Sequence, residues 1–259
     1  MAAVDVWAAH FGLTRTPFTK TIPANKLFER AAHGEAVARI HYCINQAALG
    51  VIVGDTGAGK TVAVRAAVTG PDRTKYTLVY LSNPSGGCRG LYVAIATALG
   101  ATPQFHKAEA INQAAALLAA EEHERHRRVI FVIDEAHLLS PEQLEEIRLL
   151  SNAELDSASP FAAILVGQPT LAARLRQGIF AALDQRISVR YTIAGMDLAE
   201  SIGYLRHHLA QALLTELPAV YHGVGRVVCG MVPGHGQRGG RFIGAGVVGG
   251  PAGRVAEGD

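Results

Sequence analysis

The stretch from Gly54 to Thr61, GDTGAGKT, constrains what this chain can fold into more than any other feature. It fits the pattern G-x-x-x-x-G-K-[ST] of a phosphate-binding loop, whose glycines let consecutive backbone N–H groups converge on a polyphosphate. The apolar run LGVIV comes directly before the loop, and a helix-compatible run, VAVRAAV, comes directly after it. The sequence therefore predicts a strand, a loop and a helix in the order that a nucleotide site requires. A glycine-rich turn without this role would not need the Lys-Thr pair at its end.

The end of this loop carries most of its predicted chemistry. Lys60 is expected to reach the β- and γ-phosphate oxygens as a point charge, and the hydroxyl of Thr61 to ligate Mg²⁺. The N-terminus of the following helix adds partial positive charge to the anion site. The predicted nucleotide-binding residues are Gly54, Asp55, Thr56, Gly57, Ala58, Gly59, Lys60, Thr61 and Val62.

A second chemical element is VIFVIDEAHLL, residues 129–139. Its five leading apolar residues deliver Asp134 and Glu135 to the C-terminal end of a buried strand. We expect Asp134 to contribute a carboxylate to the Mg²⁺ shell and Glu135 to polarise the water that attacks the γ-phosphate. Acidic residues can also simply cap a strand, but the phosphate loop upstream favours the catalytic interpretation.

The rest of the chain alternates between strand and helix patterns, which indicates an α/β fold. Asn83 falls at the C-terminal end of one expected strand, where polar residues reach toward ligands in open α/β sheets, and Gln168 falls at the tip of another. Further strands are expected within 77–86, 160–171 and 188–195. Helices are expected at 31–47, 89–100, 108–128 and 170–187, and from the capping boxes that begin at Ser140 and Asp197.

The length, net charge and cysteine content of the chain limit its domain number, its partners and its cellular compartment. At 259 residues the chain can hold one α/β domain with a small appendage, and its net charge of +2 neither demands nor excludes a nucleic-acid partner. Three scattered cysteines, Cys43, Cys88 and Cys229, suggest a reducing compartment. The sequence has no signal-peptide pattern and no apolar run as long as a membrane span. We therefore expect a cytoplasmic protein with no membrane partner.

The composition divides the chain into four parts. We expect an N-terminal strap at 1–30, in which Phe11, Leu13, Pro17 and Phe18 clamp onto the domain, and a nucleotide-binding core at 31–196. The start of a further helical region is expected at 197–217. In 218–259, which holds 13 of the 28 glycines, neither helical nor strand periodicity persists. This tail is either a natural flexible segment or the product of an out-of-frame translation.

The order of the segments FGLTRTPF, GDTGAGKT, VIFVIDEAHLL, ILVGQPTL and LDQRI resembles that of the ExeA/TniB-type AAA+ ATPases. These include secretion-assembly ATPases and ATP-dependent helper proteins of transposons. The resemblance covers most of the chain before the glycine-rich tail. It implies a three-layer P-loop fold with a five-strand parallel sheet and helices on both faces. It also implies an ATP-driven oligomer with ATP and Mg²⁺ as cofactors.

The resemblance also suggests roles for single residues. Gln168 matches the sensor that polls the γ-phosphate, and Asn83 matches a polar residue that restrains the catalytic glutamate. Arg186, in LDQRI, matches an arginine finger that acts on ATP bound by the neighbouring subunit, with Arg190 as the second choice. Each arginine is alternatively an ordinary surface charge, because only its position can decide the role.

The sequence departs from these relatives after Glu216, where the G-x-P-R motif of their helical lid is missing. The lid is therefore expected to be largely missing. The leading functional hypothesis is an oligomeric ATPase that binds double-stranded DNA and helps a transposase. The alternatives are an ExeA-like secretion-assembly ATPase and a nucleotide-binding remnant without turnover. A helicase is excluded because two RecA-like domains cannot fit in this length, although DEAH (134–137) echoes a helicase motif.

Overall fold

The computed structural model of this chain describes most of residues 26–212. The described residues are Leu13, Thr14, Pro17, Phe18, Ile22, 26–70, Asp72, 74–151 and 159–212. Phe11 of the expected strap, residues 213–217 and the glycine-rich tail at 218–259 lie outside them.

Five parallel strands form one sheet in the order β2-β3-β4-β1-β5. The central strands are almost continuously apolar because helices cover both faces of the sheet, as is usual for parallel sheets. The predicted five-strand parallel α/β sheet is confirmed. The strands are β1 (Leu49–Gly54), β2 (Tyr76–Leu81), β3 (Arg128–Ile133), β4 (Phe161–Gly167) and β5 (Ile187–Ile193).

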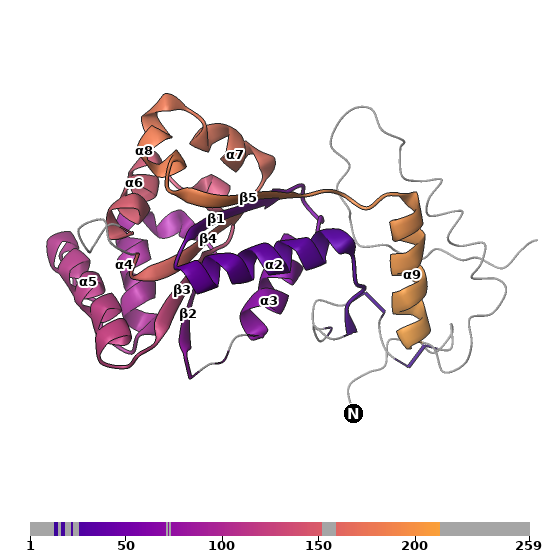
Figure 1. The fold of residues 1–259 in the computed structure, drawn as a ribbon, viewed down its shortest axis with the longest axis horizontal. Helices are drawn as coiled ribbons and strands as arrows, with labels where there is room; N and C mark the ends of the chain where they lie inside the picture. Colours follow the sequence, from indigo (N-terminus) through magenta and orange to yellow (C-terminus); the bar gives the residue numbers. More distant parts are fainter. Residues whose placement is uncertain are drawn as a thin grey trace, which may run out of the picture.

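Helices form a layer on each face of the sheet, and each layer encloses its own apolar core (Figure 1). One layer consists of α2 (Ala31–Gln46) and α3 (Lys60–Thr69). The other consists of α4 (Gly87–Ala98), α5 (Lys107–His123), α6 (Pro141–Leu150), α7 (Pro169–Leu175) and α8 (Ala181–Asp184). Among the described residues, short 3-10 turns are η2 (Pro84–Gly86), η3 (Ala136–Leu138) and η4 (Gly178–Phe180). The predicted three-layer arrangement is therefore confirmed.

The helix expected at 170–187 is broken in the structure. α7 ends at Leu175, Gln177 is extended, and η4 and α8 follow. In a straight helix Phe180 would lie about 180° around the axis from Leu171, because each residue turns by about 100°. The break lets both side chains enter the same core. Likewise α5 ends at His123, earlier than expected, because the chain turns at His126 (φ 52°) to begin β3.

Two expected capping boxes are confirmed. Ser140 accepts a hydrogen bond from the backbone of Gln143, whose side chain accepts one from the backbone of Ser140. Asp197 and Glu200 exchange the same pair of bonds at the start of α9 (Leu198–Ala212). α9 stands beyond the end of β5, apart from the two helical layers (Figure 1). None of the helices in the described part of the chain combines the length and the apolar content needed to cross a membrane.

Candidate active site

The register of the sheet brings the two sequence motifs to one edge. β1 ends at Gly54 and β3 at Ile133, and β4 lies between them, with Val53 opposite Gly167. Gln168 follows β4 directly and is the N-cap residue of α7. The phosphate loop, the acidic pair and Gln168 therefore leave adjacent strands at the same carboxyl edge, as the sequence predicted.

The phosphate loop has the backbone geometry that its glycines allow. Gly57 (φ 85°) and Gly59 (φ 87°) both lie in the left-handed region, which side chains disfavour. A Cβ at Gly59 would also overlap the imidazole of His33. The Nε2 atom of His33 lies 3.0 Å from the carbonyl oxygen of Ala58, so a residue of α2 contacts the loop directly.

Lys60, the first residue of α3, lies buried beneath the loop. Its ammonium group donates to the carbonyl oxygens of Gly54 (2.8 Å) and Asp55 (2.9 Å). An ammonium group has three N–H donors. These two bonds anchor Lys60 inside the loop and leave a donor for a phosphate oxygen.

The acidic pair meets the loop through Asp134. The hydroxyl of Thr61 donates to Asp134 Oδ2 at 3.1 Å, and the backbone N–H of Glu135 donates to Oδ1 at 2.9 Å. A hydroxyl and a carboxylate oxygen side by side are the hard oxygen donors that suit Mg²⁺. The residues present therefore fit a magnesium ion, with Thr61 and Asp134 as the side chains that would hold it.

Sequence reasoning missed Tyr80, near the end of β2. Its hydroxyl donates to Asp134 Oδ2 at 2.9 Å, so this oxygen receives two hydroxyl hydrogen bonds. Burial, together with the neighbouring Asp134 carboxylate, raises the pKa of Tyr80 to about 12. No sequence pattern marks this contact, because it depends on the pairing of β2 with β3.

Glu135 has an unusual backbone and a histidine neighbour. Its φ of 52° and ψ of 33° lie in the left-handed region, which is uncommon for residues other than glycine and clusters at functional sites. Nδ1 of His137 lies 3.3 Å from Glu135 Oε2. Arg174 of α7 donates to the carbonyl oxygens of His137 (2.9 Å) and Leu139 (2.8 Å), which fixes the turn after Glu135. The only sequence signal for His137 was its place in DEAH.

A cavity of about 540 Å³ opens beside the phosphate loop, bounded by α3, α9 and described residues of the N-terminal strap. Its wall is mainly apolar and aromatic, as is typical of pockets for organic ligands. It includes Phe18, Phe28, Arg30, His33, Gly57, Gly59, Thr61, Val62, Met196 and Tyr204. The sequence singled out Gly57, Gly59, Thr61 and Val62 of this set for nucleotide binding.

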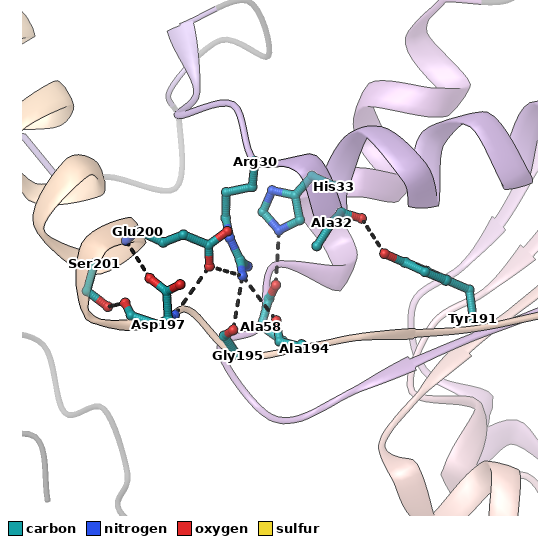
Figure 2. Close-up of polar contacts among 10 residues, drawn as sticks. All are labelled: Arg30, Ala32, His33, Ala58, Tyr191, Ala194, Gly195, Asp197, Glu200 and Ser201. Atoms are coloured by element: carbon teal, nitrogen blue, oxygen red, sulfur yellow. Dashed lines mark hydrogen bonds and ion pairs between the residues drawn. The ribbon is translucent and has the colours of Figure 1, made fainter. Parts of the chain in front are cut away.

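Arg30 and His33, at the start of α2, contact the beginning of α9 and the phosphate loop, respectively (Figure 2). Arg30 occupies the N-cap position of α2, and its side chain is only 2% exposed. Its Nη2 donates to the carbonyl oxygens of Ala194 (3.2 Å) and Gly195 (3.1 Å) and to Glu200 Oε2 (2.8 Å). One turn further along, His33 contacts the phosphate loop. The hydrogen bond from Arg30 holds the pKa of Glu200 below its usual range.

The remaining predicted residues have other hydrogen-bond partners or other locations. The Asn83 side chain accepts a hydrogen bond from the backbone N–H of Ser85 and caps η2. Arg186 immediately precedes β5 and lines a second cavity at the opposite edge of the sheet, near Leu49 and Phe161. Arg190, the second choice for the finger, donates to Asp184 Oδ1 at 2.7 Å. Neither arginine belongs to the cluster around its own phosphate loop.

The fold and the sequence both match known proteins. The family described as AAA domain matches residues 44–175. General secretion pathway protein A of Aeromonas hydrophila is 31% identical over 217 residues, which cover 80% of this chain and 38% of that protein. This chain thus spans well under half the length of that relative.

Two solved structures are similar in fold. The ORC2 protein of Aeropyrum pernix, in its ADPNP-ADP complexes, is 16% identical with a TM-score of 0.63, over 80% of this chain and 58% of that chain. The ORC1 protein of the same organism, in complex with DNA, is 14% identical with a TM-score of 0.60, over 81% and 58%. At these identities the likeness concerns the fold alone. The family match spans half of the chain and includes the phosphate loop and the acidic pair, and the sequence is similar to General secretion pathway protein A, so the chain belongs to the AAA domain family.

Proposed function

We propose that this chain binds ATP together with Mg²⁺ and hydrolyses the bond to the γ-phosphate. The observation that carries the proposal is the 3.1 Å hydrogen bond between Thr61 Oγ1 and Asp134 Oδ2, which joins two motifs 73 residues apart. A phosphate loop and a carboxylate at the end of a nearby buried strand are the parts that P-loop ATPases require.

The side chains around this hydrogen bond have different roles in binding and hydrolysing ATP. Backbone N–H groups of the loop and the ammonium group of Lys60 hold the phosphates. Thr61 and Asp134 would hold magnesium, which would supply positive charge to the phosphate oxygens. Glu135, half exposed, orients and polarises the attacking water, and Nδ1 of His137 lies 3.3 Å from its carboxylate. Gln168, which follows the strand between β1 and β3, contacts the γ-phosphate.

The 540 Å³ cavity is the proposed place for the adenosine part of the nucleotide. It adjoins Gly57 and Thr61, so a molecule bound there can continue into the phosphate loop. Phe28 and Tyr204 offer aromatic surface to a purine base. A nucleotide bound in this way contacts the core and α9 at the same time.

The position of Arg186 supports an oligomeric ATPase. Leu49, the first residue of β1, pairs with Ile187, whereas the phosphate loop begins at the other end of β1. At about 3.3 Å per residue, this separates the two ends by roughly 16 Å along the strand. Arg186 therefore cannot serve the site of its own subunit, and its role as a finger requires a neighbouring copy of the chain. Asn83 remains a proposed partner of Glu135 in the nucleotide-bound state.

For the partner, we favour double-stranded DNA and a transposase. The sequence resemblance to transposition helpers supports this choice, and a protein of similar fold, ORC1 of Aeropyrum pernix, was solved in complex with DNA. The similarity to General secretion pathway protein A favours a second candidate, an ATPase that assembles an envelope machine.

Steady-state ATP hydrolysis, measured with and without duplex DNA, tests both candidates. Glu135→Gln serves as the blank, because an amide cannot polarise water as a carboxylate does. Turnover that rises with DNA and vanishes in the variant would support the transposition helper. Turnover that is the same with and without DNA would favour the assembly ATPase. ATP binding without any turnover would instead indicate a nucleotide-binding remnant.

A further inference from the structure

The carboxylate of Asp134 is fixed by hydrogen bonds from three elements. Oδ1 accepts from the backbone N–H of Glu135, and Oδ2 accepts from the hydroxyls of Thr61 (3.1 Å) and Tyr80 (2.9 Å). An ionised carboxylate only accepts hydrogen bonds, so both hydroxyls are donors in this arrangement. The Tyr80 bond is the shorter of the two on Oδ2, and it comes from a strand outside both sequence motifs.

The location of Tyr80 indicates that the main contribution of this residue is the hydrogen bond of its hydroxyl and not the packing of its ring. β2 is the edge strand of the sheet, and Tyr80 remains 44% exposed. Its ring therefore contributes little to a core. Tyr76, four residues earlier and on the same face of the strand, places its hydroxyl only within 3.5 Å of Asn45 Oδ1. Of these two tyrosines, only Tyr80 reaches a residue of the candidate site.

We propose that Tyr80 is a positioning residue for the magnesium site, which holds Asp134 Oδ2 in place beside Thr61. This inference rests on the proposed ATP and Mg²⁺ site. A fixed carboxylate does not have to lose its freedom of rotation when the cation binds, so less free energy is spent on ordering it. Without the Tyr80 hydroxyl, Asp134 keeps one hydroxyl partner on Oδ2 and binds the hydrated cation less well.

The test is a Mg²⁺ titration of nucleotide binding with Tyr80→Phe, which removes one oxygen atom and keeps the ring. A fluorescent ATP analogue at fixed concentration reports binding by its anisotropy while Mg²⁺ is added. The Mg²⁺ concentration at half-saturation should rise about tenfold or more, the effect of one lost hydrogen bond to a charged group. Binding of the analogue in excess EDTA should not change. Tyr76→Phe, the matched control, should behave like the wild type in both measurements.

Three results would overturn the inference. Equal Mg²⁺ midpoints in the wild type and Tyr80→Phe, with binding intact, would remove the role of Tyr80 and leave the proposed function standing. An equal loss of binding with and without Mg²⁺ would show that Tyr80 only shapes the pocket. Failure of the wild type to bind the analogue under either condition would overturn the proposed function, and this inference with it. Thermal unfolding of both variants confirms that they are folded.

Discussion

Gly59 is the residue at which two separate constraints on the phosphate loop meet. Its φ of 87° is costly for any residue with a Cβ, and a Cβ there would overlap the ring of His33. We expect Gly59→Ala to lower the free energy of unfolding by about 1–3 kcal/mol, since the left-handed region alone costs about 1–2 kcal/mol. Nucleotide affinity should fall at least tenfold because the loop must shift. Urea unfolding and nucleotide titration measure the two effects.

Gly34 provides the control for this substitution. It lies within α2, and a Cβ there would meet nothing within 4 Å. Gly34→Ala should raise stability by about 0.5–1 kcal/mol, because alanine is the better helix former. Adding His33→Ala to Gly59→Ala should relieve the overlap but not the backbone strain. Wild-type affinity and stability in Gly59→Ala would contradict both constraints on the loop.

At the scale of elements, the attachment of α9 depends on the ion pair between Arg30 and Glu200. Glu200→Gln should lower the free energy of unfolding at neutral pH by about 1–3 kcal/mol, because a buried guanidinium group loses its charged acceptor. Nε and Nη1 of Arg30 already lack hydrogen-bond partners among the described residues, so nothing described there compensates for the loss. Hydrogen exchange in α9 should rise in the same variant.

This contribution has a defined pH dependence. The hydrogen bond from Arg30 lowers the pKa of Glu200 in the folded protein from the ordinary value of 4.5. The stabilisation is therefore complete above that value and is lost as the pH falls through the lowered pKa. Unfolding free energies of wild type and Glu200→Gln should converge in acid. Glu145→Gln, which breaks the exposed pair with Arg148, should cost less than about 1 kcal/mol at neutral pH. A constant gap at every pH would contradict the assignment to Glu200.

Local sequence patterns predicted most helices and strands. Tertiary contacts determined the features that the sequence did not predict. The capping box of Ser140 and Gln143 was readable because both partners lie within one turn. The break in the helix before Phe180 could not be predicted from the sequence, because it depends on the core into which the Phe180 ring packs. The spacing of the sequence motifs identified Lys60 and Asp134 as residues of the candidate site. It could not find Tyr80 or Arg30, whose partners are supplied by distant segments.

At the scale of the whole molecule, the placement of Arg186 predicts complementation between subunits. Arg186→Ala should keep nucleotide binding but lose turnover by about 10³-fold or more, as expected for an arginine finger. Lys60→Ala should lose nucleotide binding and keep its Arg186. A mixture of the two inactive proteins should regain part of the turnover, because the Arg186 of one subunit can complete the nucleotide site of the other. Steady-state hydrolysis across a series of mixing ratios measures this.

Arg176→Ala provides the control for this experiment. Arg176 is exposed and follows α7. The Arg176→Ala protein should hydrolyse ATP by itself, and its turnover should not change when it is mixed with the other variants. Turnover by Arg186→Ala alone at the wild-type rate would contradict the finger role, and the same experiment with Arg190→Ala would then test the second choice.

The position of β1 inside the sheet, between two later strands, also affects how the chain folds during synthesis. β1 lies between β4 and β5, and Leu49 pairs with Ala163 and Ile187, far downstream. At a synthesis rate of roughly 5–20 residues per second, β1 leaves the ribosome several seconds before either partner exists. During that time LGVIVG is an unpaired apolar strand, the kind of segment that associates with other chains. Chains that end before β5 should therefore aggregate in the cell, although they contain the complete phosphate loop.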